Sequence, residues 1–141
     1  MPGERTRVLP VLVGAGQAID RAGDPASGRE PLALMEEAAR RAAEDAGSDG
    51  RLLGALDTIA VVNIISWDYG NAPGILAERL GCHPARTIYT TLGGNTPQAL
   101  VNHFADEMSR RPYRLLTGVK PLSQPRDTTR RADPVRDSTR P

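Results

Sequence analysis

The sequence is poor in cysteine, lysine and aromatic residues, and these shortages exclude several classes of protein. Cys82 is the single cysteine of the 141-residue chain, which excludes an internal disulfide and a multi-cysteine metal site. We therefore expect a reducing compartment, the cytoplasm, and no bound metal. No apolar run approaches the ~18 residues of a membrane span, and the first ten residues lack the apolar stretch of a secretory signal.

Charge is distributed unevenly along the chain, although the net charge is only +1. Residues 1–109 have nine basic and fourteen acidic side chains, whereas residues 110–141 have nine basic and three acidic ones, together with five of the twelve prolines. This composition predicts that residues 119–141 form a solvated, disordered tail. A basic tail can also bind nucleic acid. Because it lacks the interleaved aromatics of a single-strand binder, we do not expect a nucleic-acid partner.

Residues 8–118 alternate between strand-like and helix-like patterns. The expected strands lie in residues 8–19, 57–63, 86–91 and 113–118, and the expected helices in residues 31–47, 71–81 and 95–111. The first strand would be followed by a glycine turn, and the second would be buried. This order predicts the α/β class, with a mainly parallel sheet of about four strands and helices on both faces.

Ligands of open α/β sheets bind beyond the carboxyl ends of the strands, and two turns of this chain meet that condition. The first, VGAGQAID, contains Gly14 and Gly16. It lacks the third glycine of a dinucleotide-binding fingerprint, and a long loop separates it from the next helix. We therefore interpret these glycines as a tight turn after a strand, and we expect no nicotinamide or flavin cofactor.

The second turn, TTLGGNTPQ, joins an expected strand directly to an expected helix. Gly93 and Gly94 allow close approach of a ligand to the backbone, or an unusual dihedral angle. Asn95 or Thr96 would cap the helix, whose free amide groups and dipole favour negative charge. An oxyanion or a thioester oxygen would suit that position. The alternative is that GGNTP is merely a capped helix start, and the spacing alone does not separate the two.

Five segments, in this order and spacing, resemble the N-terminal part of the thiolase superfamily. They are PVLVGAGQAIDR, PLALMEEAARRAAEDAG, LDTIAVVN, APGILAERLG and TIYTTLGGNTPQALVN. The resemblance covers residues 8–109, with a weaker similarity in LLTG at 115–118, and is greatest to a thiolase-like acetyl-CoA acetyltransferase. It implies the N-terminal half of a thiolase-like fold, a coenzyme A thioester as substrate, and no further cofactor.

The resemblance also implies which position would have held the nucleophile. Thiolases use a cysteine at the N-terminus of the helix that follows the third strand, and that position is Gly93 here. Glycine cannot be acylated, so covalent catalysis of the usual kind is excluded at this position. Cys82 precedes the strand, at the opposite end of the sheet. His83 and His103 lie in no matching motif. We therefore predict no catalytic residue, and Gly93, Gly94, Asn95 and Thr96 as the substrate-binding turn.

The general-base histidine and the second cysteine of thiolases come from a C-terminal half that this sequence does not contain. We expect residues 8–118 to form an incomplete thiolase-like domain without activity of its own. A GC-rich gene read out of frame would give a tail such as 119–141. The alternative function is a non-catalytic module that binds acyl-CoA or forms a homo-oligomer by pairing residues 86–91, as thiolases do.

Overall fold

The computed structural model describes residues 9–48, 50–110 and 115–118. It contains a sheet of three parallel strands in the order β2-β1-β3. The strands are β1 (Thr58–Val61), β2 (Arg86–Tyr89) and β3 (Leu115–Gly118). The register pairs Val61 of β1 with Tyr89 of β2 and with Gly118 of β3. The predicted α/β class and parallel strand direction are confirmed.

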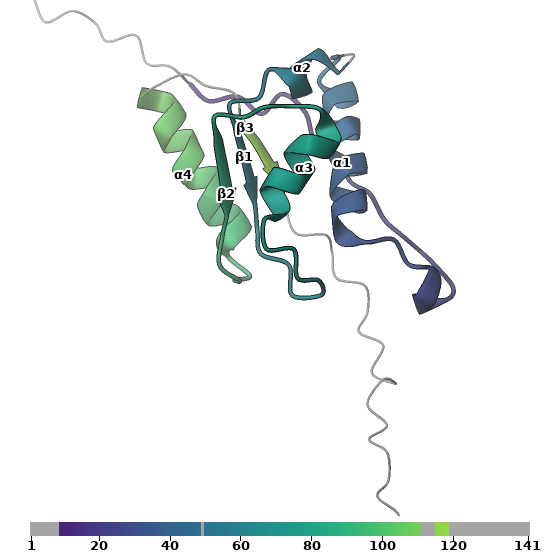
Figure 1. Ribbon diagram of the computed structural model, residues 1–141. Helices are drawn as coiled ribbons and strands as arrows, with labels where there is room; N and C mark the ends of the chain where they lie inside the picture. The colour runs from purple at the N-terminus through teal and green to yellow at the C-terminus, as the bar shows by residue number, and fades with distance from the viewer. Residues whose placement is uncertain (1–8, 49, 111–114, 119–141) are drawn as a thin grey trace, which may run out of the picture.

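Helices cover both faces of the sheet (Figure 1). α1 (Pro31–Asp45) and α3 (Ala72–Leu80) lie on one face, and α4 (Thr96–Arg110) lies on the other. The short helices η1 (Pro25–Ser27) and α2 (Arg51–Gly54) belong to the loops before and after α1. The strands run from the end of the sheet near α2 to the opposite end, where α4 begins.

β1 forms the centre of the core, because all four of its residues are buried. Ile59 and Val61 pack with α1 and α3 in the larger apolar cluster. Ala60 packs on the opposite face, with Leu100 and Phe104 of α4. This alternation is the period of two that a strand covered on both faces requires. The predicted buried strand in residues 57–63 is therefore confirmed.

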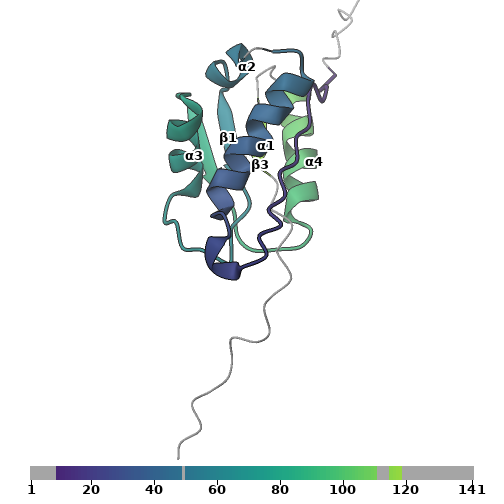
Figure 2. The same cartoon turned by 90° about the vertical axis from the view of Figure 1, so that its right-hand side faces the viewer.

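The predicted strand in residues 8–19 is wrong for the part of that range that the structure describes. Residues 9–22 contain no strand. They precede α1 in the sequence and run alongside it in space as an extended segment (Figure 2). Leu9, Val11, Leu12 and Val13 are 67%, 78%, 87% and 60% exposed. Pro10 also lacks the amide hydrogen that pairing with another strand would need. The apolar run therefore packs only lightly on the rest of the described structure.

Gly14 and Gly16 do not serve the tight turn that the sequence predicts; they lie against the backbone of α1. A Cβ atom on Gly14 would lie 2.1 Å from the carbonyl oxygen of Ala42, and one on Gly16 would lie 2.0 Å from that of Ala38. Both glycines therefore let the segment contact the backbone of α1 directly. The amide of Ala15 donates to Asp45 Oδ2 at 2.9 Å and fixes the same contact.

α3 and α4 lie within the ranges that the sequence predicts for them. The side chain of Asn71 accepts a hydrogen bond from the amide of Gly74 in the first turn of α3, and Gly81 ends that helix with a φ of 68°. α4 begins at Thr96, and Phe104 is its most deeply buried residue. The predicted tail, residues 119–141, lies outside the described residues.

Candidate functional site

The turn between β2 and α4 lies at the carboxyl end of the sheet, as the sequence predicts. The amide of Thr90 donates to the carbonyl of Val61 at 3.0 Å, which continues the β1–β2 pairing by one residue. The chain then reaches Gly93, whose carbonyl accepts from the amide of Thr96 at 3.3 Å. Thr96 is the first residue of α4. The structure therefore brings Gly93, Gly94, Asn95 and Thr96 together in one turn.

Gly93 leaves a side-chain position that Thr96 partly fills. A Cβ built on Gly93 would lie 2.4 Å from Thr96 Oγ1 and 3.2 Å from Asn95 Oδ1. A side chain at position 93 would therefore point toward the side chains at the start of α4. Because Thr96 Oγ1 is the end of a rotatable side chain, a small residue fits at position 93 once that hydroxyl turns away.

Gly94 is an exposed residue with open space around it. A Cβ built on Gly94 would meet no other atom within 4 Å. Neither Gly93 nor Gly94 has a positive φ, so the unusual dihedral angle considered from the sequence is not present. Gly94 therefore leaves the main chain accessible to a ligand, whereas the side chains of Asn95 and Thr96 lie beside Gly93.

The backbone amides of Gly93, Gly94, Asn95 and Gln98 have no acceptor among the described residues. Pro97 has no amide hydrogen, and the amide of Ala99 already donates to the carbonyl of Asn95 at 3.0 Å. Unpaired amides at a helix N-terminus attract negative charge, and the helix dipole adds to that attraction. The turn can therefore stabilise a developing oxyanion.

A second loop, residues 62–71, reaches the same end of the sheet between β1 and α3. The amide of Ile64 donates to Tyr89 Oη at 3.3 Å, which links this loop to β2. Tyr69 Oη accepts from the amide of Leu32 at 3.3 Å and donates to Glu30 Oε2 at 3.0 Å. Partial burial, followed by the neighbouring Glu30 carboxylate, raises the pKa of Tyr69. The hydroxyl therefore stays protonated and holds the loop against the start of α1.

This loop was not predicted from the sequence to be part of the site. A signal for it is present in the motif SWDYG, which holds the single tryptophan of the chain and a tyrosine directly after a buried strand. The rings of Trp67 and Tyr69 stack with their centroids 6.3 Å apart. Trp67 is 53% exposed.

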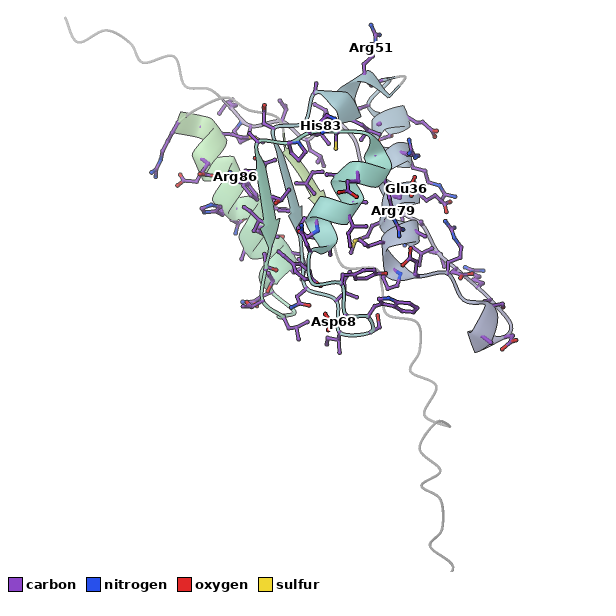
Figure 3. All side chains as sticks on the ribbon, in the orientation of Figure 1. Glu36, Arg51, Asp68, Arg79, His83 and Arg86 are labelled. Atoms are coloured by element: carbon purple, nitrogen blue, oxygen red, sulfur yellow. The ribbon has the colours of Figure 1, made fainter. Side chains whose placement is uncertain are left out.

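The other candidate groups lie away from the turn. Cys82 is buried before β2, where its Sγ donates to the carbonyl of Ala77 at 3.5 Å, and burial raises the pKa of this thiol. His83 is exposed beside it, at the end of the sheet opposite Asp68 (Figure 3). His103 Nε2 lies 3.5 Å from Glu107 Oε2 on an exposed part of α4. The structure brings none of these three residues to the turn.

Arg86 and Glu107 fix α4 on the edge of the sheet. Arg86 donates to both carboxylate oxygens of Glu107, at 3.3 and 2.9 Å, and its guanidinium lies 5.3 Å from the centre of the Phe104 ring. Bidentate pairs of this kind restrict geometry as well as adding energy. The N-terminus of α4 therefore has a defined position relative to β2.

No described helix is long and apolar enough to cross a bilayer. In the same parts of the chain, no three His, Cys, Asp or Glu side chains are grouped as metal ligands would be.

Comparison with models of known protein families gave no match, and comparison with curated proteins gave none either. Solved structures do match. One is a monomeric SCP2-thiolase-like protein type 1 from Mycobacterium smegmatis, with a TM-score of 0.63 and 29% sequence identity over 74% of this chain. Another is the priming β-ketosynthase of the R1128 polyketide biosynthetic pathway, with a TM-score of 0.59 and 16% identity over 84% of this chain.

The structure has a thiolase-like α/β fold, which agrees with the arrangement of β1, β2, α3 and α4 described above. The chain spans 22% of the length of the SCP2-thiolase-like protein and 45% of that of the β-ketosynthase. These neighbours support the predicted thiolase-like resemblance at the level of the superfamily.

Proposed function

We propose that this chain is the acyl-CoA-binding part of a thiolase-like acyltransferase of the acetyl-CoA acetyltransferase class, without turnover of its own. The reaction of that class joins acetyl-CoA to an acyl-CoA and gives a 3-ketoacyl-CoA and free coenzyme A, or runs in reverse. The observation that carries the proposal is the turn at residues 93–96. There an open glycine backbone meets unpaired amides at the start of α4.

In the proposed complex the thioester oxygen lies against the amides of Gly94 and Asn95. These groups would stabilise the negative charge that grows on that oxygen during condensation or thiolysis. Gly94 would allow the approach because no atom occupies the space beside it. Thr96 Oγ1 lies beside the neighbouring Gly93, 2.4 Å from where a Cβ of that residue would be, and can donate a further hydrogen bond.

No covalent step is assigned to this chain. Position 93 has no side chain, and the buried thiol of Cys82 lies before β2 with its pKa raised. A thiol becomes a strong nucleophile only as the accessible thiolate, which both features of Cys82 oppose. We therefore expect binding of acyl-CoA and no formation of an acyl-enzyme.

A thermal melt with and without acyl-CoA, paired with an assay for release of free coenzyme A, tests this proposal. A ligand that binds only the native state raises the melting midpoint, because it stabilises that state. At a ligand concentration of a hundred times the Kd, the added stability is about 2.7 kcal/mol. We expect a cooperative melt that acyl-CoA shifts upward, and no turnover. A melt that acyl-CoA leaves unchanged would contradict the proposed binding, and turnover would contradict the passive role of position 93.

The second candidate function is a dimerisation module, and the position of β2 favours it. β2 pairs with β1 alone among the described strands, so its outer edge is available to another strand. Exposed edges readily pair with further chains. The dimer would pair residues 86–91 with the same residues of a second copy. Light scattering of the purified chain tests this, since a monomeric mass at high concentration would exclude the dimer.

The proposed location is the cytoplasm, where acyl-CoA is available and a free thiol such as Cys82 remains reduced. Cell fractionation checks this location, and recovery of the chain in a secreted fraction would exclude it.

A further inference from the structure

Three large apolar side chains are exposed at the carboxyl end of the sheet. Ile65, Trp67 and Leu92 are 62%, 53% and 51% exposed. They come from the two loops that leave β1 and β2, and both loops lie at the end of the sheet where α4 begins (Figure 1). Single exposed apolar residues are common on protein surfaces, but several at a ligand-binding edge indicate a contact surface. We call these three residues the apolar strip.

One residue of the apolar strip adjoins the candidate thioester site, and the other two lie on the loop at the same end of the sheet. Leu92 directly precedes Gly93. Ile65 directly follows Ile64, whose amide donates to Tyr89 Oη. The hydrogen bond between Thr90 and Val61 joins the same two loops at their bases. The turn at residues 93–96 and the apolar strip therefore lie at the same end of the sheet.

Trp67 is held in place by its neighbours. It stacks on Tyr69, and Tyr69 is hydrogen-bonded to the amide of Leu32 and to Glu30. Glu30 also forms an ion pair with Arg79 of α3. An indole that is exposed and yet supported by two helices offers a ready contact surface and loses little freedom when a ligand binds.

We propose that the apolar strip binds the acyl chain of the acyl-CoA, so that the site prefers chains of about eight carbons or more over acetyl. This inference rests on the function proposed above. The thioester would lie at Gly93 and Gly94, and the chain would extend from Leu92 past Ile65 toward Trp67. An acetyl group is too short to leave the turn, so it gains nothing from the strip.

The chemistry of the strip favours an acyl chain over the nucleotide end of coenzyme A. Ile65 and Leu92 are aliphatic and offer no hydrogen bond to a base. Asp68 follows Trp67 directly and lies at the same end of the sheet (Figure 3). Its carboxylate would repel the phosphates of coenzyme A. An uncharged hydrocarbon chain meets neither obstacle.

The single tryptophan makes the test direct, because all indole fluorescence reports on Trp67. The purified chain is titrated with coenzyme A, acetyl-CoA, octanoyl-CoA and dodecanoyl-CoA, each below its micellar concentration. We expect a blue shift with the two long thioesters alone. Each fully buried methylene contributes about fourfold in affinity, so partial contact predicts a Kd for octanoyl-CoA at least ~10-fold below that for acetyl-CoA.

Variants distinguish binding at the apolar strip from nonspecific hydrophobic binding. Ile65→Asn and Leu92→Asn, measured by calorimetry, should bring the ratio of the acetyl-CoA and octanoyl-CoA Kd values toward one. Val101→Asn is the matched control, since Val101 is 47% exposed on α4 outside the strip. It should leave the ratio unchanged.

Three other outcomes would overturn the inference. Equal binding of all thioesters would overturn the apolar strip and leave the proposed function intact. Failure of every thioester to bind would overturn both. A blue shift that follows protein concentration rather than thioester concentration would assign the strip to contact between copies of the chain, and would also overturn the inference.

Discussion

Position 93 decides what chemistry the turn can perform. The side chain that a nucleophile would need is absent, and Thr96 Oγ1 lies beside the place where it would begin. The backbone around this position is otherwise that of a helix start with unpaired amides. Binding and charge stabilisation therefore remain possible without covalent catalysis.

Replacing Gly93 with cysteine tests whether the turn still activates a nucleophile. A thiol at a helix N-terminus has its pKa lowered from the usual ~8.5, because the dipole favours the thiolate. We expect Gly93→Cys to add one reactive thiol whose labelling rate rises with an inflection below pH 8.5. The pH dependence of labelling with a chromogenic disulfide measures this.

The unmodified chain is the control for that labelling. Cys82 is 3% exposed and its pKa is raised by burial, so the native chain should react only when it unfolds. An inflection at or above pH 8.5 for the new thiol would show that the start of α4 does not favour negative charge.

Gly14 and Gly16 give a second residue-scale prediction. Adding a methyl group at either position would force it against a backbone carbonyl of α1, at 2.1 or 2.0 Å. Overpacking of this kind costs about 1–3 kcal/mol. We expect Gly14→Ala and Gly16→Ala each to lower the free energy of unfolding by about that amount in a urea titration.

Gly23→Ala is the matched control for these two variants, because a Cβ there would meet no atom within 4 Å. It should leave the urea midpoint unchanged. If all three variants unfolded alike, the close contact between residues 14–16 and α1 would be contradicted.

Among the elements, α1 owes part of its stability to the surface pairs of Glu37. Glu37 accepts from Arg29 before the helix and from Arg41 one turn later. The hydrogen bond from Arg29 is the main reason that the pKa of Glu37 is lowered below 4.5. A lowered folded-state pKa means that the carboxylate stabilises the native state when it is ionised.

The pH dependence of a Glu37→Gln variant tests this network. The stabilisation by Glu37 is fully present above the ordinary glutamate pKa of 4.5 and is lost as the pH falls through the lower folded-state value. We expect the variant to be slightly less stable than the native chain at pH 7, and the difference to be smaller at pH 2.5. The effect is small because the pair is exposed.

Thermal melts at both pH values measure the Glu37 effect, with Glu44→Gln as the control on the same helix. Glu44 forms no ion pair with any described residue. A stability difference for Glu37→Gln that is as large at pH 2.5 as at pH 7 would contradict the electrostatic explanation.

The sequence predicted elements well where the pattern and the packing agree. The turn at residues 93–96 and the buried strand β1 follow from β-branched runs, glycines and a proline in the first turn of the helix, which act locally. The strand expected in residues 8–19 did not form, because an apolar run predicts a strand without specifying which edge would pair with it. The role of Tyr69 depends on Leu32 and Glu30, which are far from it in the sequence.

At the scale of the whole molecule, the helices on the two faces pack against the central β1 in two apolar clusters, and the proposed site lies at one end of the sheet. The turn at residues 93–96 and the loop 62–71 meet at that end, and Cys82 and His83 lie at the other end of the sheet. The fold resembles part of larger thiolase-like structures.

The most direct test of acyl-CoA binding at Gly94 is calorimetric titration of octanoyl-CoA into the native chain and into Gly94→Ala. The added methyl group meets no atom and needs no positive φ, so the fold should tolerate it while the ligand loses access to the backbone. Gly54→Ala, equally unobstructed in α2, is the control. We predict that Gly94→Ala weakens binding at least ~10-fold, or about 1.4 kcal/mol, and that Gly54→Ala does not. Equal affinity of the native chain and Gly94→Ala would contradict the account.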